Sequence, residues 1–188
     1  GNCRLVKDNS MRWFIPLFVL SSISSLVQSD DSMYQLGPDS VRQEHVPRGN
    51  VTEHIWRSDV FPDTIRRYWV YVPAQYNDST AAAVMAFQDG HAYVGESADF
   101  RVPVVFDNLI HAGELPVMVG IFIDPGHKKQ DLPEKPGWRP RPENRSFEYD
   151  TLSDQYSRLL IEEVLPEVGK RVNLTDAPNQ RAICGISS

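Results

Sequence analysis

The chain has 188 residues, of which 41% are hydrophobic and 23% are charged, as expected for one ordinary globular domain. Its 19 basic and 25 acidic side chains give a formal charge of −6, which argues against a protein that mainly coats nucleic acid. Two cysteines, Cys3 and Cys184, cannot build a disulfide scaffold, so the fold must rest on an apolar core.

An apolar run near the amino terminus is typical of a secretory signal peptide. It extends from Trp13 to Leu20, follows a single arginine, and is succeeded by small residues before an acidic start at Asp30. The run is shorter than the roughly 20 residues that a membrane-spanning helix needs. We therefore expect an upstream extension plus a signal peptide in residues 1–29, an N-terminal extension in residues 30–49, and a secreted or periplasmic protein without a stable membrane anchor. A buried N-terminal helix is the alternative, although the apolar residues run consecutively and not at helical spacing.

The next segments read as strands. Residues 51–57 and 66–73 are β-rich and are joined by the turn-forming sequence at 61–64, which predicts an antiparallel pair. Residues 81–87 and 116–123 are continuous apolar runs, typical of strands buried on both faces in a parallel sheet covered by helices. We expect a last short strand at residues 181–185.

Two helices fit this pattern. The first covers residues 102–111, with Val105, Leu109 and Ala112 on its buried face and Gly113 as its stop. The second covers residues 153–172.

For the second helix we expect N-terminal capping by Asp154 and by the hydroxyl of Ser153 or Thr151, and a kink or early stop at Pro166. Its apolar face comprises Tyr156, Leu159, Leu160, Val164, Leu165 and Val168.

Residues 127–145 are rich in proline and arginine, which predicts a long surface loop. Its arginines, Arg139, Arg141 and Arg145, either attract an anionic substrate or are simply solvated in an acidic protein.

The end of the chain carries the clearest chemical motif. A strand that leads into Gly-x-Ser can hold the serine at the apex of a sharp elbow, with its hydroxyl exposed above the sheet. Gly185 and Ser187 occupy these positions after the last predicted strand. From the motif alone, a nucleophile and an ordinary turn serine are both open.

A second motif follows the third predicted strand. In α/β hydrolases the loop at this place donates one backbone N–H to the oxyanion hole, and the residue after the nucleophile donates the other. The donors would be the N–H of His91 or Gly90 and that of Ser188, with glycine allowing close approach of the backbone. Asp89-Gly90 as a common turn is the alternative.

Taken together, five segments resemble the esterases related to enterochelin esterase, which are α/β hydrolases similar also to esterase D and the mycolyl transferases. The resemblance covers roughly residues 50–188. The segments are 68–76, 84–93, 121–126, 145–150 and 184–188.

The resemblance implies an α/β-hydrolase fold over residues 50–188, with a mostly parallel sheet covered by helices and truncated after the nucleophile strand. It implies Ser187 as the nucleophile, Gly185 as the structural glycine of the elbow, and a catalytic acid and histidine after residue 188. It also implies a substrate contact for Asp89, no cofactor, and a small-molecule or glycan-linked ester as substrate.

All five histidines precede the serine and are therefore poor candidates for the base. Arg145, Glu148 and Asp150 are interpreted as mainly structural and ion-paired. Expressed alone, the 188-residue chain is expected to be inactive and aggregation-prone.

Other interpretations remain open. One is a non-catalytic carbohydrate- or surface-binding protein on the same fold; a structural extracellular module is less favoured, because the strands read as covered and parallel. We expect neither a metal site, since the histidines are scattered, nor a nucleic-acid partner. The sequence leaves the oligomeric state open. Four Asn-x-Ser/Thr sites would permit glycosylation: Asn50, Asn77, Asn144 and Asn173.

Overall fold

The computed structural model describes residues 35–128 and 131–186. From Leu36 onward the described residues form one compact unit, which carries the fold described below. The predicted signal peptide in residues 1–29 lies outside the described residues.

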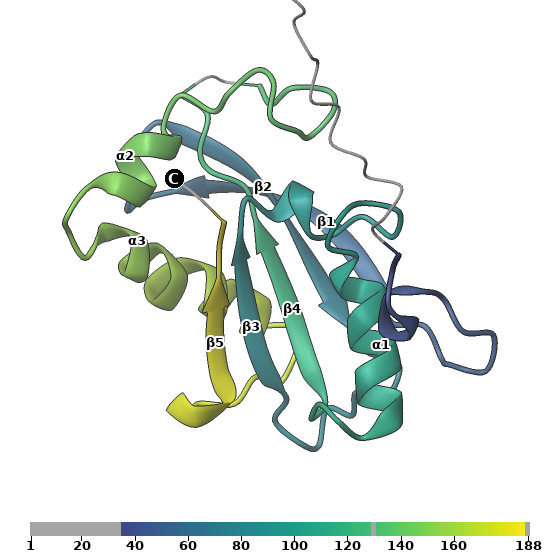
Figure 1. The fold of residues 1–188 in the computed structure, drawn as a ribbon. Coiled ribbons are helices and arrows are strands. Elements are labelled where there is room, and N and C mark those ends of the chain that lie inside the picture. Colours follow the sequence, from purple (N-terminus) through teal and green to yellow (C-terminus); the bar gives the residue numbers. More distant parts are fainter. Residues whose placement is uncertain (1–34, 129–130, 187–188) are drawn as a thin grey trace, which may run out of the picture. The chain divides into compact units, whose positions relative to one another are not determined.

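A five-stranded sheet forms the centre of this unit, in the order β1-β2-β4-β3-β5 (Figure 1). The strands are β1 (Asn50–Ser58), β2 (Thr64–Val72), β3 (Ala83–Gln88), β4 (Met118–Ile123) and β5 (Arg181–Cys184). All five strands were predicted within a few residues of these bounds.

The sheet is mixed, which corrects the expected mostly parallel sheet. β1 pairs with β2 and β2 with β4 in antiparallel fashion, whereas β3 is parallel to both β4 and β5. The β1–β2 connection is too short for the crossover that parallel strands need, so these strands form a hairpin. Asp63 takes a left-handed conformation in its turn, with φ of 60°. The predicted antiparallel pair and the buried strands β3 and β4 are confirmed.

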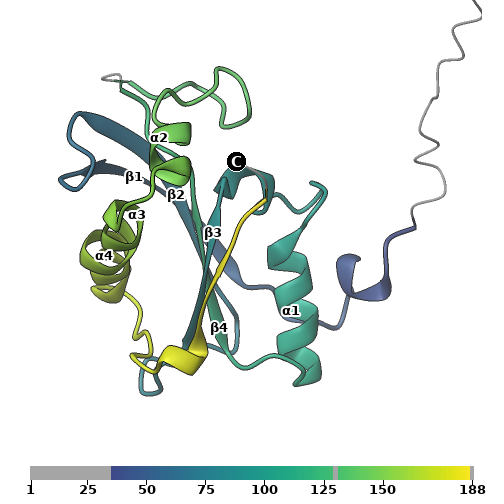
Figure 2. The ribbon, with the colours of Figure 1, turned by 60° about the vertical axis from the view of Figure 1, so that its left-hand side comes forward.

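Helices cover both faces of the sheet (Figure 2). One face packs against α1 (Val102–Ala112). The other packs against a continuous helical segment made of α3 (Gln155–Arg158), a π-helical turn η4 (Leu159–Val164) and α4 (Leu165–Gly169). Short elements complete the set: α2 (Arg145–Asp150) and the 3₁₀ turns η2 (Pro38–Ser40), η3 (Gly90–Ala92) and η5 (Pro178–Gln180).

Helix α1 confirms the predicted bounds but not the predicted face. Val102, Phe106 and Ile110 are buried against the aromatic side of the sheet, whereas Ala112 is exposed. The sheet offers Tyr71, Phe87 and Phe122 on this side, and the larger ring of Phe106 packs among them. Gly113 ends the helix at φ of 74°, as predicted.

The second predicted helix exists with its predicted apolar face, and Leu159, Val164 and Val168 are almost fully buried. It is interrupted by the π-helical turn, and Pro166 lies directly after that turn in the first turn of α4. Proline lacks an N–H and its ring collides with the preceding turn of a regular helix, and π turns mark such irregular points. The predicted side-chain cap by Asp154 is wrong, because its side chain makes no capping bond.

A fully buried ion pair attaches α2 to the sheet. Arg66 on β2 donates to Glu148 on α2 at 2.6 and 3.0 Å, and neither side chain is exposed. The same carboxylate accepts the backbone N–H of Gly126 at 3.0 Å and the amide N–H of Asn144 at 2.7 Å. Glu148 therefore ties one helix and both ends of the loop at residues 127–144 to β2. The loop was predicted over residues 127–145 and ends one residue earlier, because Arg145 begins α2. Over its described residues it contains no helix or strand apart from an isolated β-bridge between His127 and Ile65.

The segment before β1 is tied to α1. The buried carboxylate of Asp107 is paired with Arg42 and accepts the N–H of Gly49 at 2.8 Å and the hydroxyl of Tyr71 at 2.7 Å. Residues 36–49 are thus packed on the domain, although the sequence presented them as an extension. Among the described residues, no helix is both long and apolar enough to span a bilayer.

Gly90, two residues after the end of β3, lies against the backbone of β4. A Cβ atom at this position would stand 2.4 Å from the carbonyl carbon of Phe122 and 2.5 Å from the nitrogen of Ile123. Both atoms are backbone and cannot move aside without shifting the strand. Glycine is therefore required for packing between two strand ends.

Replacing Glu148 by Gln should destabilise the protein by about 3–5 kcal/mol, because the charge of Arg66 stays buried without its counter-charge. Urea unfolding measures the change. Arg158→Gln, which breaks the exposed pair between Arg158 and Glu162, is the matched control and should leave the midpoint near the native value. An equal effect of both substitutions would contradict the special role of the buried pair.

Gly90→Ala should cost roughly 1–3 kcal/mol of stability, because a methyl group would be forced into the β4 backbone. Gly113→Ala serves as a comparison, since a Cβ there meets no atom within 4 Å and only the positive φ is strained. A higher unfolding midpoint for Gly90→Ala than for native protein would refute this packing.

Candidate active site

The carboxyl ends of the three parallel strands lie at one edge of the sheet, as Figure 1 shows. The turn at residues 89–91 follows β3, Asp124 follows β4, and Gly185 and Ile186 follow β5. In open α/β sheets, ligands bind in the crevice outside these ends. The topology thus brings residues 89–91 and residues 185–186, the described part of the Gly-x-Ser motif, to the same edge.

A cavity of about 430 Å³ opens at this edge. Ile186 lines it and is the residue immediately before Ser187. The volume falls in the range of small-molecule sites, which is about 300–1,000 Å³. The other lining residues are Asp89, His91, Trp138, Arg141, Pro142 and Arg145.

Asp89 and Arg145 form a buried, bidentate ion pair in the cavity wall. The guanidinium of Arg145 donates to the two carboxylate oxygens at 2.9 and 2.7 Å, and this bonding raises the pKa of Arg145. Asp89 is 1% exposed and has a left-handed backbone with φ of 54°. The carboxylate of Asp89 is thus already paired with Arg145. The substrate contact predicted for Asp89 stays a prediction.

Helix α2 therefore supplies two structural ion pairs, one from Arg145 and one from Glu148. This confirms the structural interpretation of both residues. Asp150, grouped with them, is exposed at the end of the helix.

His91 is held by Asp124. The backbone N–H of His91 donates to Asp124 Oδ1 at 3.0 Å, and its ring Nδ1 lies 2.8 Å from the same oxygen. The His91 N–H thus already donates to a carboxylate, and its predicted role as an oxyanion donor stays a prediction. The N–H of Gly90 is the other candidate for the oxyanion donor. The close packing of the Gly90 backbone on β4 also requires a residue without a side chain at this position.

Two half-buried tyrosines lie near the turn after β3, and one of them binds it directly. The hydroxyl oxygen of Tyr149 accepts the N–H of Asp89 at 3.2 Å, and the rings of Tyr149 and Tyr156 meet edge to face at 5.3 Å. Burial raises the pKa of both phenols, so they stay neutral near pH 7. They contribute hydrogen-bonding groups and no charge.

The elbow itself is described only up to Ile186. Gly185 lies beside Gln88, and a Cβ on it would stand 2.3 Å from the Gln88 side-chain oxygen. This oxygen belongs to the flexible side chain of Gln88, which can move aside, so the structural role predicted for Gly185 stays a prediction. Ser187 and Ser188 lie outside the described residues, and their proposed nucleophile and oxyanion roles stay predictions.

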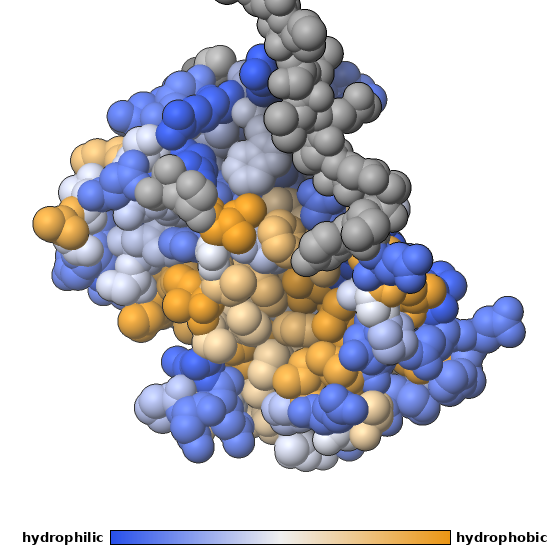
Figure 3. All heavy atoms as spheres, viewed as in Figure 1, coloured by the Kyte–Doolittle hydropathy of each residue, from blue (hydrophilic) through white to orange (hydrophobic). Residues whose placement is uncertain are grey.

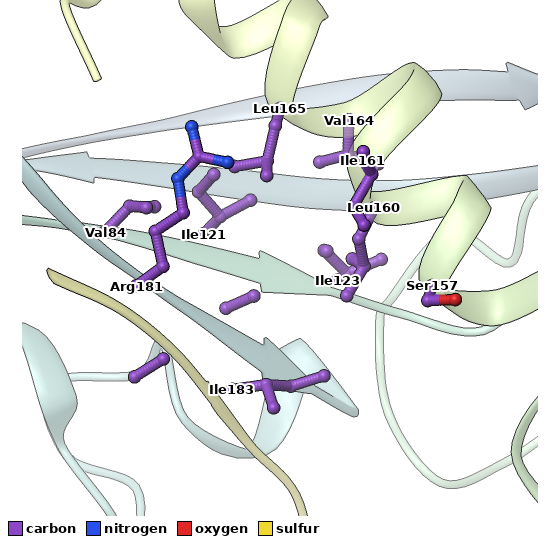
Figure 4. A pocket seen from close by; sticks show the side chains of 12 residues that line it. Val84, Ile121, Ile123, Ser157, Leu160, Ile161, Val164, Leu165, Arg181 and Ile183 are labelled. Atoms are coloured by element: carbon purple, nitrogen blue, oxygen red, sulfur yellow. The ribbon is translucent and has the colours of Figure 1, made fainter. Parts of the chain in front are cut away.

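A second hollow lies between β3, β5 and the helical segment, with a volume of about 340 Å³ (Figure 4). Its lining is aliphatic except for Ser157 and Arg181. Figure 3 shows apolar side chains gathered over the middle of the molecule in this view. Among the residues that line the hollow, Ile161 and Ile183 are more than half exposed. The residues that line this hollow include no pair of acid and base groups, so the edge cavity is the candidate site.

The sequence did not single out Asp124 and Trp138. Asp124 directly follows a buried strand, a position whose side chain reaches the carboxyl edge, so it could have been found. Trp138 lies in the proline-rich loop and carried no comparable signal. Arg139 and Arg141 are exposed, and Arg141 donates to the hydroxyl of Ser146 at 2.8 Å. Over the described part of the chain, no three metal-ligating side chains come together.

Comparisons with solved structures show the same fold. A ferulic acid esterase of the CE1 class from Anaeromyces mucronatus, in complex with ferulic acid, has a TM-score of 0.58 at 18% identity and matches 81% of this chain and 54% of its own. The enterobactin esterase from Shigella flexneri, determined in the presence of enterobactin, has a TM-score of 0.58 at 20% identity and matches 81% and 33%.

This chain thus spans about half of the first enzyme and a third of the second. A search of curated protein sequences found no match. The sequence profile of the family described as "Putative esterase" matches residues 62–188, which is more than half of the chain. The resemblance to enterochelin-type esterases is thereby confirmed, and the chain belongs to this esterase family.

Proposed function

We propose that the protein containing this chain is a serine carboxylic-ester hydrolase, with Ser187 as its nucleophile. The observation that carries the proposal is the edge cavity, because Ile186 lines it and directly precedes Ser187. Membership of the esterase family adds the reaction class. In this proposal the acid and the histidine follow the serine in the complete protein, as the family resemblance implies.

The chemistry follows the serine-hydrolase scheme. The histidine takes the proton of the Ser187 hydroxyl while its oxygen attacks the ester carbonyl, and the tetrahedral oxyanion is held by backbone N–H groups. Loss of one such donor typically costs about 3 kcal/mol of transition-state stabilisation. Ser188 and Gly90 are the proposed donors. Collapse of the intermediate expels the alcohol and leaves an acyl-enzyme, which water then hydrolyses.

The proposed substrate is a small-molecule or glycan-linked ester. The solved relatives were determined with ferulic acid and with enterobactin, so aromatic esters are the first class to test. The cavity adds Trp138, which is 51% exposed, and the guanidinium of Arg141 at its lining. These groups suit a substrate that combines a ring with polar or anionic substituents.

Ser187→Ala in the complete gene product should lower hydrolysis of p-nitrophenyl acetate and methyl ferulate by at least about a thousandfold, because no other step replaces the nucleophile. Release of p-nitrophenol and of ferulate measures the loss. Ser97→Ala, at an exposed loop position, is the control and should hydrolyse at the native rate. Native protein that binds these esters but leaves them intact would favour the non-catalytic alternative.

We also propose that the protein is exported, on the strength of the apolar run at Trp13–Leu20. In a eukaryotic secretory host, Asn50 and Asn77 should then accept glycans, because both are exposed. Asn144 should not, since it is 2% exposed and its amide donates to Glu148. Peptide mass spectrometry after glycosidase treatment reads each site, and a glycan on Asn144 in folded protein would contradict the structure.

A further inference from the structure

His91 presents an unused hydrogen-bonding atom in the edge cavity. Its side chain is 8% exposed and lines the cavity, yet Nε2 is buried and has no hydrogen-bond partner among the described residues. An unpaired buried polar atom costs free energy, so in native proteins each such group calls for an explanation. A ligand that completes the bond would explain this one.

The other side of the ring determines what Nε2 can bind. An ionised carboxylate only accepts hydrogen bonds, so Nδ1 carries the proton that points to Asp124 at 2.8 Å. The backbone N–H of His91 binds the same oxygen, which fixes the ring relative to the turn. In the neutral imidazole Nε2 then offers a lone pair and no hydrogen. The atom therefore selects a hydrogen-bond donor.

The charges around the cavity indicate whether the hydrogen-bond donor of the ligand is charged or neutral. The charge of Asp89 is neutralised by Arg145. The guanidinium of Arg141 adds a positive charge, and it donates a hydrogen bond to the uncharged hydroxyl of Ser146. A cationic amine would meet this positive charge, and the remaining carboxylate, Asp124, lies behind the imidazole and outside the cavity lining. A neutral hydroxyl meets no such repulsion.

Trp138 forms an apolar wall beside the imidazole. The two rings meet edge to face with centroids 4.5 Å apart, and the guanidinium of Arg145 lies 5.9 Å from the indole ring. Trp138 comes from the loop at residues 127–144, whereas His91 comes from the turn after β3. A ligand that reaches Nε2 therefore lies next to an aromatic side chain.

We propose that His91 is a substrate-binding residue that accepts a hydrogen bond from a hydroxyl group of the ester, and thereby selects hydroxylated esters over their methyl ethers. Asp124 is the positioning residue that fixes the imidazole with Nε2 as acceptor. This inference rests on the proposed ester-hydrolase function but concerns binding, so it can be tested without turnover.

The test uses the complete gene product with Ser187→Ala, so that bound esters persist. Equilibrium binding is measured by tryptophan fluorescence for two matched pairs, one for each side of the ester bond. The first pair is methyl ferulate and its O-methylated counterpart, and the second is hydroxyethyl benzoate and methoxyethyl benzoate. In at least one pair the hydroxylated ester should bind about tenfold more tightly, which is the effect of one buried hydrogen bond of about 1.4 kcal/mol.

Adding His91→Phe should bring that ratio to about one, because the acceptor is gone. Adding His91→Gln should keep part of the preference, since its amide oxygen can still accept, and this variant guards against a mere folding defect. His111→Phe, at an exposed position on α1, is the matched control and should keep the full ratio.

Equal binding of both members in each pair, or a preference that survives His91→Phe, would overturn the inference. Hydrolysis by the native protein is read separately. Absence of ester hydrolysis by the native protein would refute the proposed function. The ratio of the two binding affinities would still test the role of His91. If His91→Phe abolished turnover of hydroxylated and methylated esters alike and flattened the pH profile, His91 would be the catalytic base and the selectivity role would be wrong.

Discussion

The buried ion pair between Arg66 and Glu148 is the constraint on which the site depends. Taking two charges out of water is costly, and the cost is offset only when every oxygen finds a donor. Glu148 achieves this with Arg66, Gly126 and Asn144, which come from β2 and from the two ends of the proline-rich loop. The pair therefore does more than join a helix to a strand, because it fixes the path of the loop that forms one wall of the cavity.

One turn earlier on the same helix, Arg145 extends this arrangement to the next part of the sheet. Arg145 binds Asp89 just after β3, while Glu148 binds Arg66 on β2. A helix of six residues therefore connects two strands that are not neighbours in the sheet. So short a helix has little stability of its own. Its position is set by these two contacts, and through them the aromatic and cationic groups of the loop stand opposite the turn after β3.

The turn after β3 shows how one short sequence serves several needs. Asp89 binds Arg145 of α2, Gly90 lets the turn pack on the β4 backbone, and His91 is bound to Asp124 at the end of the adjacent strand. An interpretation of Asp-Gly-His by motif alone assigned these residues to oxyanion and substrate contacts. In the folded chain the side chains of Asp89 and His91 bind residues of neighbouring elements. Among the side-chain polar atoms of this turn, Nε2 of His91 is the one without a hydrogen-bond partner in the described part of the chain.

The sequence by itself determined the strands, the two long helical segments, the glycine stop of α1 and the esterase resemblance, since these depend on local periodicity, turn chemistry and motifs along the chain. It also marked residues 89–91 and 185–187 as the chemical segments. Only the tertiary structure decided that Phe106 and not Ala112 faces the core, and that β2 pairs antiparallel with β4 as well as with β1. It also decided that Arg145 pairs with Asp89 and Glu148 with Arg66, partners that lie 56 and 82 positions away in the sequence. The same is true of Asp124 and Trp138 beside His91. Such pairings depend on which strand ends become neighbours, and that is a property of the sheet order, which no local pattern in the chain encodes.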